Sequence, residues 1–176
     1  MNYGGIIKDD IANGPGIRTS LFVSGCRNNC PGCFNKEVQN FNYGKAFTDE
    51  TMIDIIDSVD DSYHYGITLL GGDPMEPENA KELLPLCKEF RNKFGNSKTI
   101  WTYTGYLYEN LIDLNYNDPR KKLLNFTDVL VDGPFVESLK DITLKFRGSS
   151  NQRIIDCEKS CRHNVVLLED YNEIIS

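Results

Sequence analysis

Three cysteines lie so close together in the sequence that one loop can place all three thiols around a common ligand. Cys26, Cys30 and Cys33 fall within eight residues and follow the spacing CxxxCxxC. Thiolates bind both iron-sulfur clusters and zinc. A [4Fe-4S] cluster held by three thiolates keeps one iron open to a substrate, whereas a structural zinc site requires a fourth protein ligand. The spacing predicts a metal centre and leaves both kinds open.

Five further side chains are candidates for a fourth ligand: Cys87, Cys157, Cys161, His64 and His163. Cys157 and Cys161 form a CxxxC pair near the C-terminus, so they are the main candidates. Cys87 lies on an apolar helical stripe, where a free cysteine is usually buried. We therefore expect Cys87 to be a structural thiol.

Three other short segments combine glycine with polar residues. In residues 71–74 (GGDP) the glycines allow a ligand to approach the backbone, and Asp73 offers a carboxylate to an ammonium group. Residues 104–105 (TG) and 132–134 (DGP) are weaker signals of the same kind. An ordinary turn, with Asp73 as a cap, is the alternative interpretation.

An aromatic ring and a polar segment have less specific interpretations. Phe34 directly follows the third cysteine, where its ring either lies against a ligand base or packs in the core. Residues 147–151 (RGSSN) offer groups for a phosphate or a partner, and we expect a solvated loop there.

Hydrophobic periodicity divides the chain into strands that alternate with helices. Short apolar runs predict strands at residues 19–23, 66–70, 99–104 and 128–131, after a turn at residues 13–16. Apolar spacing of three and four predicts helices at residues 48–61, 80–94 and 106–114. Thr48 is the expected N-cap of the first helix, and Pro85 is expected to kink or shorten the second. Weaker patterns indicate short strands at residues 144–146, 153–155 and 165–168.

The residues suited to chemistry follow the four main predicted strands. Gly71, Gly105 and Asp132 each come directly after one of these runs, and Cys26 follows the first run by three residues. Alternation of strands and helices predicts parallel βαβ units, with right-handed crossovers and both faces of the sheet covered. Active sites of such sheets gather at the carboxyl ends of the strands. Since a full eight-stranded barrel takes about 250 residues, we expect an α/β fold with an incomplete, open parallel β/α barrel.

Composition limits the class of protein. The 176 residues are 40% hydrophobic and 26% charged, which is ordinary for one globular domain, and we expect residues 1–176 to form it. The net charge of −7 argues against a nucleic-acid partner. No signal peptide and no membrane span are indicated, so we expect a cytoplasmic location, where clustered cysteines favour metal or redox chemistry over disulfides.

Taken together, these segments resemble the radical S-adenosylmethionine (SAM) enzymes. The similarity is strongest to the activating enzymes of anaerobic (class III) ribonucleoside-triphosphate reductases. It is carried by NGPGIRTSLFVSGC, CPGCFN, LLGGDPMEP, IWTYTGY and VLVDGPFVESLKDITLKFRGSSNQ, which span residues 13–152. Residues 153–176, with Cys157 and Cys161, lie outside it and form a C-terminal extension of open role.

The resemblance implies a barrel of the radical SAM type with two cofactors. Cys26, Cys30 and Cys33 would hold a [4Fe-4S] cluster, and SAM would chelate its open iron. Cleavage of SAM would give a 5′-deoxyadenosyl radical, which takes a hydrogen atom from a glycine of the reductase. Residues implied near SAM fall into three groups: Gly32, Cys33 and Phe34 along the adenosyl moiety; Gly71, Gly72 and Asp73 at the methionyl amino group; and Thr104, Gly105 and Asp132 as neighbours.

Two positions depart from the usual pattern of the superfamily. Gly32 stands where an aromatic residue usually precedes the third cysteine, so adenine stacking is not assigned to any one ring. Asp73 replaces the more usual glutamate. The CPGC and GGDP forms of the narrower family account for both.

The resemblance also implies two partners, the large subunit of the anaerobic reductase and a low-potential, flavodoxin-like electron donor. Two alternatives stay open. One is an activase of another glycyl-radical enzyme, such as pyruvate formate-lyase, and the other is a zinc-stabilised binding module that uses Cys157 or Cys161 as the fourth ligand. A third, a glycyl-radical protein itself, is excluded because 176 residues are too few for its large barrel.

Overall fold

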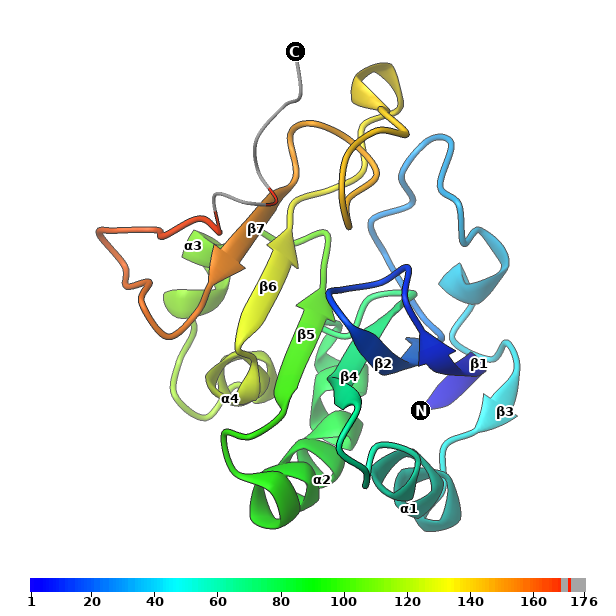
Figure 1. The fold of residues 1–176 in the computed structure, drawn as a ribbon. Coiled ribbons are helices and arrows are strands. Elements are labelled where there is room, and N and C mark those ends of the chain that lie inside the picture. The colour runs from blue at the N-terminus through cyan, green and yellow to red at the C-terminus, as the bar shows by residue number, and fades with distance from the viewer. Residues whose placement is uncertain (169–170, 172–176) are drawn as a thin grey trace.

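A computed structural model of the chain describes residues 1–168 and Tyr171, and its described strands form one mixed, seven-stranded sheet (Figure 1). The strand order is β3-β1-β2-β4-β5-β6-β7, and the edge strands β3 and β7 are not paired with each other, so the sheet is open. The strands are β1 (Asn2–Asp10), β2 (Ile17–Val23), β3 (Lys45–Ala46), β4 (His64–Gly71), β5 (Thr99–Tyr103), β6 (Val129–Asp132) and β7 (Arg153–Asp156).

The four central strands, β2, β4, β5 and β6, are parallel, as the alternating pattern predicted. They follow one another across the sheet in chain order. The connecting segments contain the helices α1 (Asp49–Asp57), α2 (Pro77–Phe94), α3 (Tyr108–Ile112) and α4 (Pro119–Phe126). Right-handed crossovers that always step in the same direction place their helices on the same face of the sheet.

The prediction that helices cover both faces is therefore wrong for the described residues. Leu21, Ile67, Ile100 and Leu130 of the central strands pack in one cluster with the helices. Alternate strand residues point to the other face, where Trp101 and Val131 pack against Phe146 and other side chains of the C-terminal part of the chain. Loops rather than helices cover that second face.

Two antiparallel strands, β1 and β3, and one helix, α4, were not predicted. β1 contains two adjacent glycines and polar residues that hide its alternation, and it pairs antiparallel to β2. β7 pairs antiparallel to β6, so the predicted strand at residues 153–155 is confirmed but its direction was not foreseen. α4 is short and polar, although Asp118 caps it by accepting from the backbone N–H of Arg120 at 2.9 Å.

Several local predictions can be compared directly with the structure. The side chain of Thr48 accepts a hydrogen bond from the N–H of Thr51, which confirms the predicted cap. α2 runs through Pro85 for 18 residues, so the predicted shortening is wrong. Pro85 and Lys81, whose carbonyl loses its helical partner, both lie on the exposed face, where water can bond to that carbonyl.

Two of the three short strands predicted near the C-terminus are absent from the described sheet. Residues 144–146 form turns rather than a strand. Residues 165–168 contribute only an isolated bridge between Leu167 and Ile155. Both stretches are short, so local alternation alone gave a weak signal for them.

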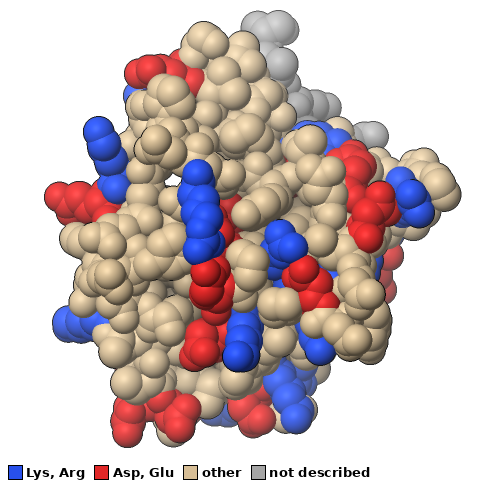
Figure 2. All heavy atoms as spheres, turned by 180° about the vertical axis from the view of Figure 1, so that it is seen from behind, with Lys and Arg blue, Asp and Glu red and all other residues tan. Residues whose placement is uncertain are grey.

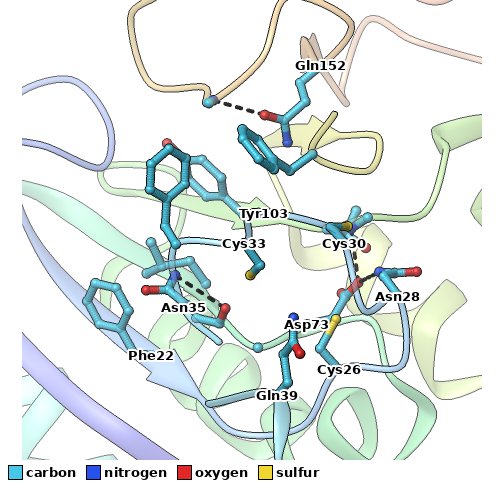
Figure 3. Close-up of a pocket in the computed structure, with 18 of the residues that line it drawn as sticks. Phe22, Cys26, Asn28, Cys30, Cys33, Asn35, Gln39, Asp73, Tyr103 and Gln152 are labelled. Carbon is cyan, nitrogen blue, oxygen red and sulfur yellow. Dashed lines mark hydrogen bonds between the residues drawn. The ribbon is translucent and has the colours of Figure 1, made fainter. Parts of the chain in front are cut away.

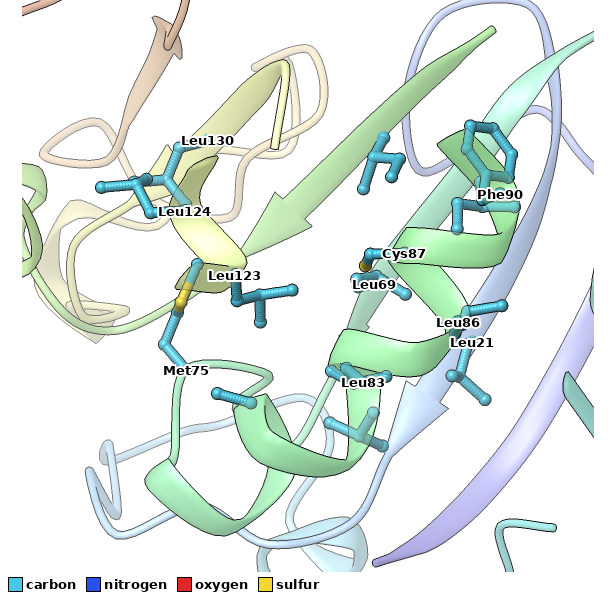
Figure 4. Close-up of a cluster of buried hydrophobic side chains, with 14 of the residues drawn as sticks. Leu21, Leu69, Met75, Leu83, Leu86, Cys87, Phe90, Leu123, Leu124 and Leu130 are labelled. Atoms are coloured by element: carbon cyan, nitrogen blue, oxygen red, sulfur yellow. The ribbon is translucent and has the colours of Figure 1, made fainter. Parts of the chain in front are cut away.

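α2 provides the main apolar contact with the sheet. Leu83, Leu86, Cys87 and Phe90 form its buried face, and Figure 4 shows them directed at the strands. Cys87 is fully buried, which confirms the expected structural thiol. Burial raises the pKa of this thiol to about 12, so it stays protonated at neutral pH.

A buried arginine joins three central strands on the opposite face. The guanidinium of Arg18 (β2) is fully buried and donates to Thr68 Oγ1 at 2.8 Å and to the carbonyls of Ile67 at 2.7 Å and Thr99 at 2.8 Å. It also lies 5.6 Å from the centroid of the Trp101 ring. Burial lowers the pKa of Arg18 to about 10, which still leaves it charged at neutral pH.

The surface carries mixed charge. In the view from behind, basic and acidic side chains lie next to one another and do not form one area of a single sign (Figure 2). Within the described residues, no helix is both long and apolar enough to cross a bilayer.

Replacing Arg18 tests the contribution of this buried hydrogen-bond network. We expect Arg18→Ala to lower the free energy of unfolding by about 3 kcal/mol, because buried acceptors on β4 and β5 lose a charged donor. Urea unfolding followed by circular dichroism measures the change. Lys8→Ala, which removes the exposed ion pair with Asp54, is the control and should cost less than about 1 kcal/mol. Equal effects of the two substitutions would contradict this role of Arg18.

Candidate functional site

A cleft of about 370 Å³ lies at the carboxyl ends of the parallel strands. In Figure 1 the segment after β2 and the segment between β6 and β7 lie beyond these strand ends. The cleft is lined by the cysteine loop and by residues that follow β4, β5 and β6, among them Gly72, Thr104 and Gly133. This volume suits a small-molecule ligand. The predicted meeting of four strand ends at one site is confirmed.

All three clustered cysteines line the cleft and are half-buried (Figure 3). Backbone hydrogen bonds fix their loop, since Cys26 N–H donates to the Gln39 carbonyl at 3.1 Å and Cys33 N–H donates to the Cys30 carbonyl at 3.2 Å. Burial raises the pKa of Cys26 to about 11. A metal that binds this thiol as thiolate must therefore displace its proton.

The donor set of the cleft suits an iron-sulfur cluster. Its three thiols come from one loop and are half-buried. In a [4Fe-4S] cluster each thiolate binds an iron of its own, so three thiols spread along one loop are suitable ligands.

The five candidate fourth ligands do not line this cleft. Cys87 is in the core, and Cys157 lines a different cavity beside α4. Cys161 and His163 are exposed near the C-terminus. His64 begins β4 and so lies at the opposite end of the strand from the cleft.

The loop that begins at Gly72, directly after β4, lies against the cysteine loop. Gly72 N–H donates to the Val23 carbonyl at 2.7 Å, and Asp73 N–H donates to the Gly25 carbonyl at 2.8 Å. A Cβ on Gly72 would lie 2.5 Å from that Gly25 oxygen. Glycine is thus required here for packing between two loops, in addition to any approach of a ligand.

Asp73 connects three of the segments that form the cleft. Its carboxylate, in a residue only 1% exposed, accepts from Met75 N–H at 2.9 Å, Asn28 Nδ2 at 2.9 Å and Gly105 N–H at 3.0 Å. Burial raises its pKa to about 6, although these hydrogen bonds oppose the shift. The carboxylate lines the cleft and also holds its walls together.

Two polar residues of the α2 region fix the cysteine loop, and sequence reasoning missed both. The Asn79 amide donates to the carbonyls of Ser24 at 3.1 Å and Asp73 at 2.9 Å. The buried Glu76 carboxylate accepts from Arg27 N–H at 2.7 Å and forms an ion pair with the Arg27 guanidinium. A polar residue in the first turn of a helix has no distinctive sequence signal, so neither role was visible before the fold.

The other predicted site residues lie at different depths. Thr104 lines the cleft, and Phe34 lies at its edge with 62% exposure. Gly32 is exposed and faces Glu137 rather than the cleft. Asp132 is fully buried on the helix side, where it accepts from Tyr108 N–H at 2.8 Å and pairs with Arg153. Gly133, its neighbour, lines the cleft instead.

Residues 147–152 form an ordered wall of the cleft, so the expected solvated loop is wrong. Gln152 Oε1 accepts from the N–H groups of Gly148 at 2.9 Å and Ser149 at 3.2 Å, and its amide donates to the Gly133 carbonyl at 3.1 Å. Ser149 is fully buried. The polar composition suggested solvent, but these side chains satisfy backbone groups of the loop that follows β6.

The raised pKa of Asp73 can be measured in the metal-free protein. We expect its carboxyl carbon to titrate in NMR with a midpoint near pH 6, and the Asn28→Ala variant to titrate at higher pH, because a hydrogen bond to the charged form is lost. Asp141 is the internal control, since hydrogen bonds from Thr143 lower the pKa of that carboxyl. A midpoint for Asp73 below that of Asp141 would contradict the described burial.

Comparison with known proteins agrees with this site. The family model of the 4Fe-4S single cluster domain matches residues 12–155. The chain is also 43% identical over 154 residues to an anaerobic ribonucleoside-triphosphate reductase-activating protein of Escherichia coli strain K12. The aligned region covers 86% of this chain and 96% of that relative.

More distant relatives bear the same name. The protein of Enterobacteria phage T4 is 38% identical over 154 residues, covering 88% of this chain and 93% of its own length. The protein of Vibrio cholerae serotype O1 is 39% identical over 156 residues, covering 88% and 97%. The chain therefore belongs to the family of anaerobic ribonucleoside-triphosphate reductase-activating proteins and carries a 4Fe-4S single cluster domain.

Proposed function

We propose that this protein is a radical SAM activase that generates a glycyl radical on anaerobic ribonucleoside-triphosphate reductase. The observation that carries the proposal is a cleft that takes three half-buried cysteine thiols from one loop, with none of the other described cysteines or histidines lining it. Three thiolates leave one iron of a [4Fe-4S] cluster available to a substrate. The names of the relatives indicate the target enzyme.

Cys26, Cys30 and Cys33 would hold the cluster in this proposal. When bound, the cluster supplies the electron that cleaves SAM to methionine and a 5′-deoxyadenosyl radical, which takes a hydrogen atom from a glycine of the reductase. The chain itself binds and orients SAM and excludes water around it.

The proposed SAM contacts follow the lining of the cleft. The methionyl amino group lies against residues 71–73, where the Asp73 carboxylate provides negative charge close to the cleft. We assign Cys33 and Phe34 to the adenosyl moiety and Thr104 as a neighbour of SAM, because all three line the cleft. Gly32 and Asp132 lie away from the lining, so we assign them no direct contact.

The arrangement of the sheet supports a partial barrel of the radical SAM type. Four parallel strands follow one another in chain order with helices on one face, which is also how a β/α barrel is built. The other face is then the interior, and the cleft opens at its carboxyl end. We place the reaction in the cytoplasm, because the thiols must stay reduced, and propose a flavodoxin-like protein as the electron donor.

Anaerobic reconstitution tests the proposed reaction. We expect iron and sulfide to give a brown protein that converts SAM to 5′-deoxyadenosine when reduced with dithionite, measured by liquid chromatography. With the anaerobic reductase added, electron paramagnetic resonance should show a glycyl radical. A reductase variant with alanine at the radical glycine is the control and should give no such signal. No turnover by a fully loaded, reduced protein would reject the proposal.

Single cysteine variants test the ligand set. We expect Cys26→Ala, Cys30→Ala and Cys33→Ala each to lose most of the about four iron atoms that a [4Fe-4S] protein binds per chain. Cys157→Ala and Cys161→Ala are matched controls and should keep the iron, because neither residue lines the cleft. Iron content and the visible absorption spectrum report both. Loss of the cluster in either control, or one tightly held zinc per chain, would favour the zinc-stabilised module instead.

A further inference from the structure

A second cavity of about 400 Å³ adjoins the cleft, and we call it the side groove. It shares Asn13, Phe34, Tyr103 and Gly148 with the lining of the cleft and extends from them along residues 140–147. A chain segment that lies in the side groove therefore reaches the cleft. Of the residues proposed above to contact the cluster or SAM, Phe34 alone also lines this groove.

The side groove exposes apolar surface. Ile142 is 89% exposed, and the Phe34 ring is 62% exposed at the junction with the cleft. Leu144 and Phe146 also line it. Exposed apolar side chains that gather beside a ligand site are typical of a binding surface for a protein or peptide.

A buried hydroxyl without a partner lies at the same junction. Tyr103 ends β5, and its ring lies above Cys33 in Figure 3. Its Oη is buried and has no hydrogen-bond partner among the described residues. Burial and the neighbouring Asp10 raise its pKa, so the group is a neutral hydroxyl at physiological pH. A buried hydroxyl left unbonded is unfavourable, and a ligand that accepts its hydrogen bond would remove that cost.

We propose that the side groove binds the glycine-bearing segment of the reductase in extended form, with the Tyr103 hydroxyl donating to a backbone carbonyl of that segment. The inference rests on the function proposed above. Hydrogen-atom transfer needs the glycine carbon in contact with the 5′-deoxyadenosyl carbon, so the segment must enter the cleft. An extended peptide has backbone carbonyls that can accept the hydrogen bond of Tyr103. It also has side chains that can pack against the apolar wall of the groove.

Crosslinking tests the location without depending on turnover. A photoreactive p-benzoylphenylalanine placed at Ile142 should crosslink the reductase within its glycine-bearing segment, as mapped by mass spectrometry. The same substitution at Ile53, an exposed residue of α1, is the matched control and should give no crosslink to that segment. Crosslinks from position 142 that map only elsewhere on the reductase would overturn the proposal.

Two variants test the proposed contacts with the peptide. Ile142→Asp should raise the reductase concentration for half-maximal activation about tenfold, while Ile53→Asp should not change it. Tyr103→Phe, which removes only the hydroxyl, should raise the same concentration, whereas Tyr65→Phe, at an exposed tyrosine that does not line the side groove, should not. An unchanged concentration in Tyr103→Phe would overturn the assignment of the hydroxyl to the peptide. Failure of the wild-type protein to cleave SAM would reject the proposed function itself and is distinguishable from both results.

Discussion

The site depends on the contact between two loops at adjacent carboxyl ends of parallel strands. The loop after β2 carries the cysteines, and the loop after β4 is held against it by the hydrogen bonds from Gly72 N–H to Val23 and from Asp73 N–H to Gly25. Only a residue without a side chain fits at position 72. Asn79, at the start of α2, donates hydrogen bonds to both loops. The helix that packs on the sheet therefore also fixes the position of the cysteine loop.

Asp73 extends this contact to the rest of the cleft. Its carboxylate reaches the cysteine loop through Asn28 and the end of β5 through Gly105. The desolvation cost that raises its pKa is offset in part by three backbone or amide donors. One buried carboxylate can therefore join three connecting segments and still leave negative potential at the cleft, as the proposed ammonium contact requires.

The one-sided placement of the helices has a consequence for chemistry. Because the helices cover only one face, the other face of the sheet can carry polar and large side chains such as Arg18, Trp101 and Tyr103. Arg18 satisfies its donors within the sheet. Tyr103 Oη has no such partner among the described residues, and that difference is why we assign it a ligand.

Local sequence patterns predicted part of the structure. Residue types and periodicity indicated a cysteine loop of CxxxCxxC spacing, the GGDP turn, the four parallel strands and the burial of Cys87. Each of these features depends on neighbours a few positions away. β1 and α4 were missed because glycines and charges mask their periodicity. Residues 165–168 were predicted as a strand on a short apolar run alone, and they contribute only one isolated bridge.

The sequence by itself predicted three cysteines as cluster ligands, and it determined that four strands end in segments that meet at one cleft. Only the tertiary structure decided the direction of each side chain. Asp132 and Gly133 are adjacent, yet the period of two in a strand end turns the carboxylate to Arg153 on the helix side and leaves the glycine in the cleft. The roles of Asn79, Glu76 and Gln152 depend on partners 19 to 55 residues away, and no local pattern records such pairings until the chain is folded.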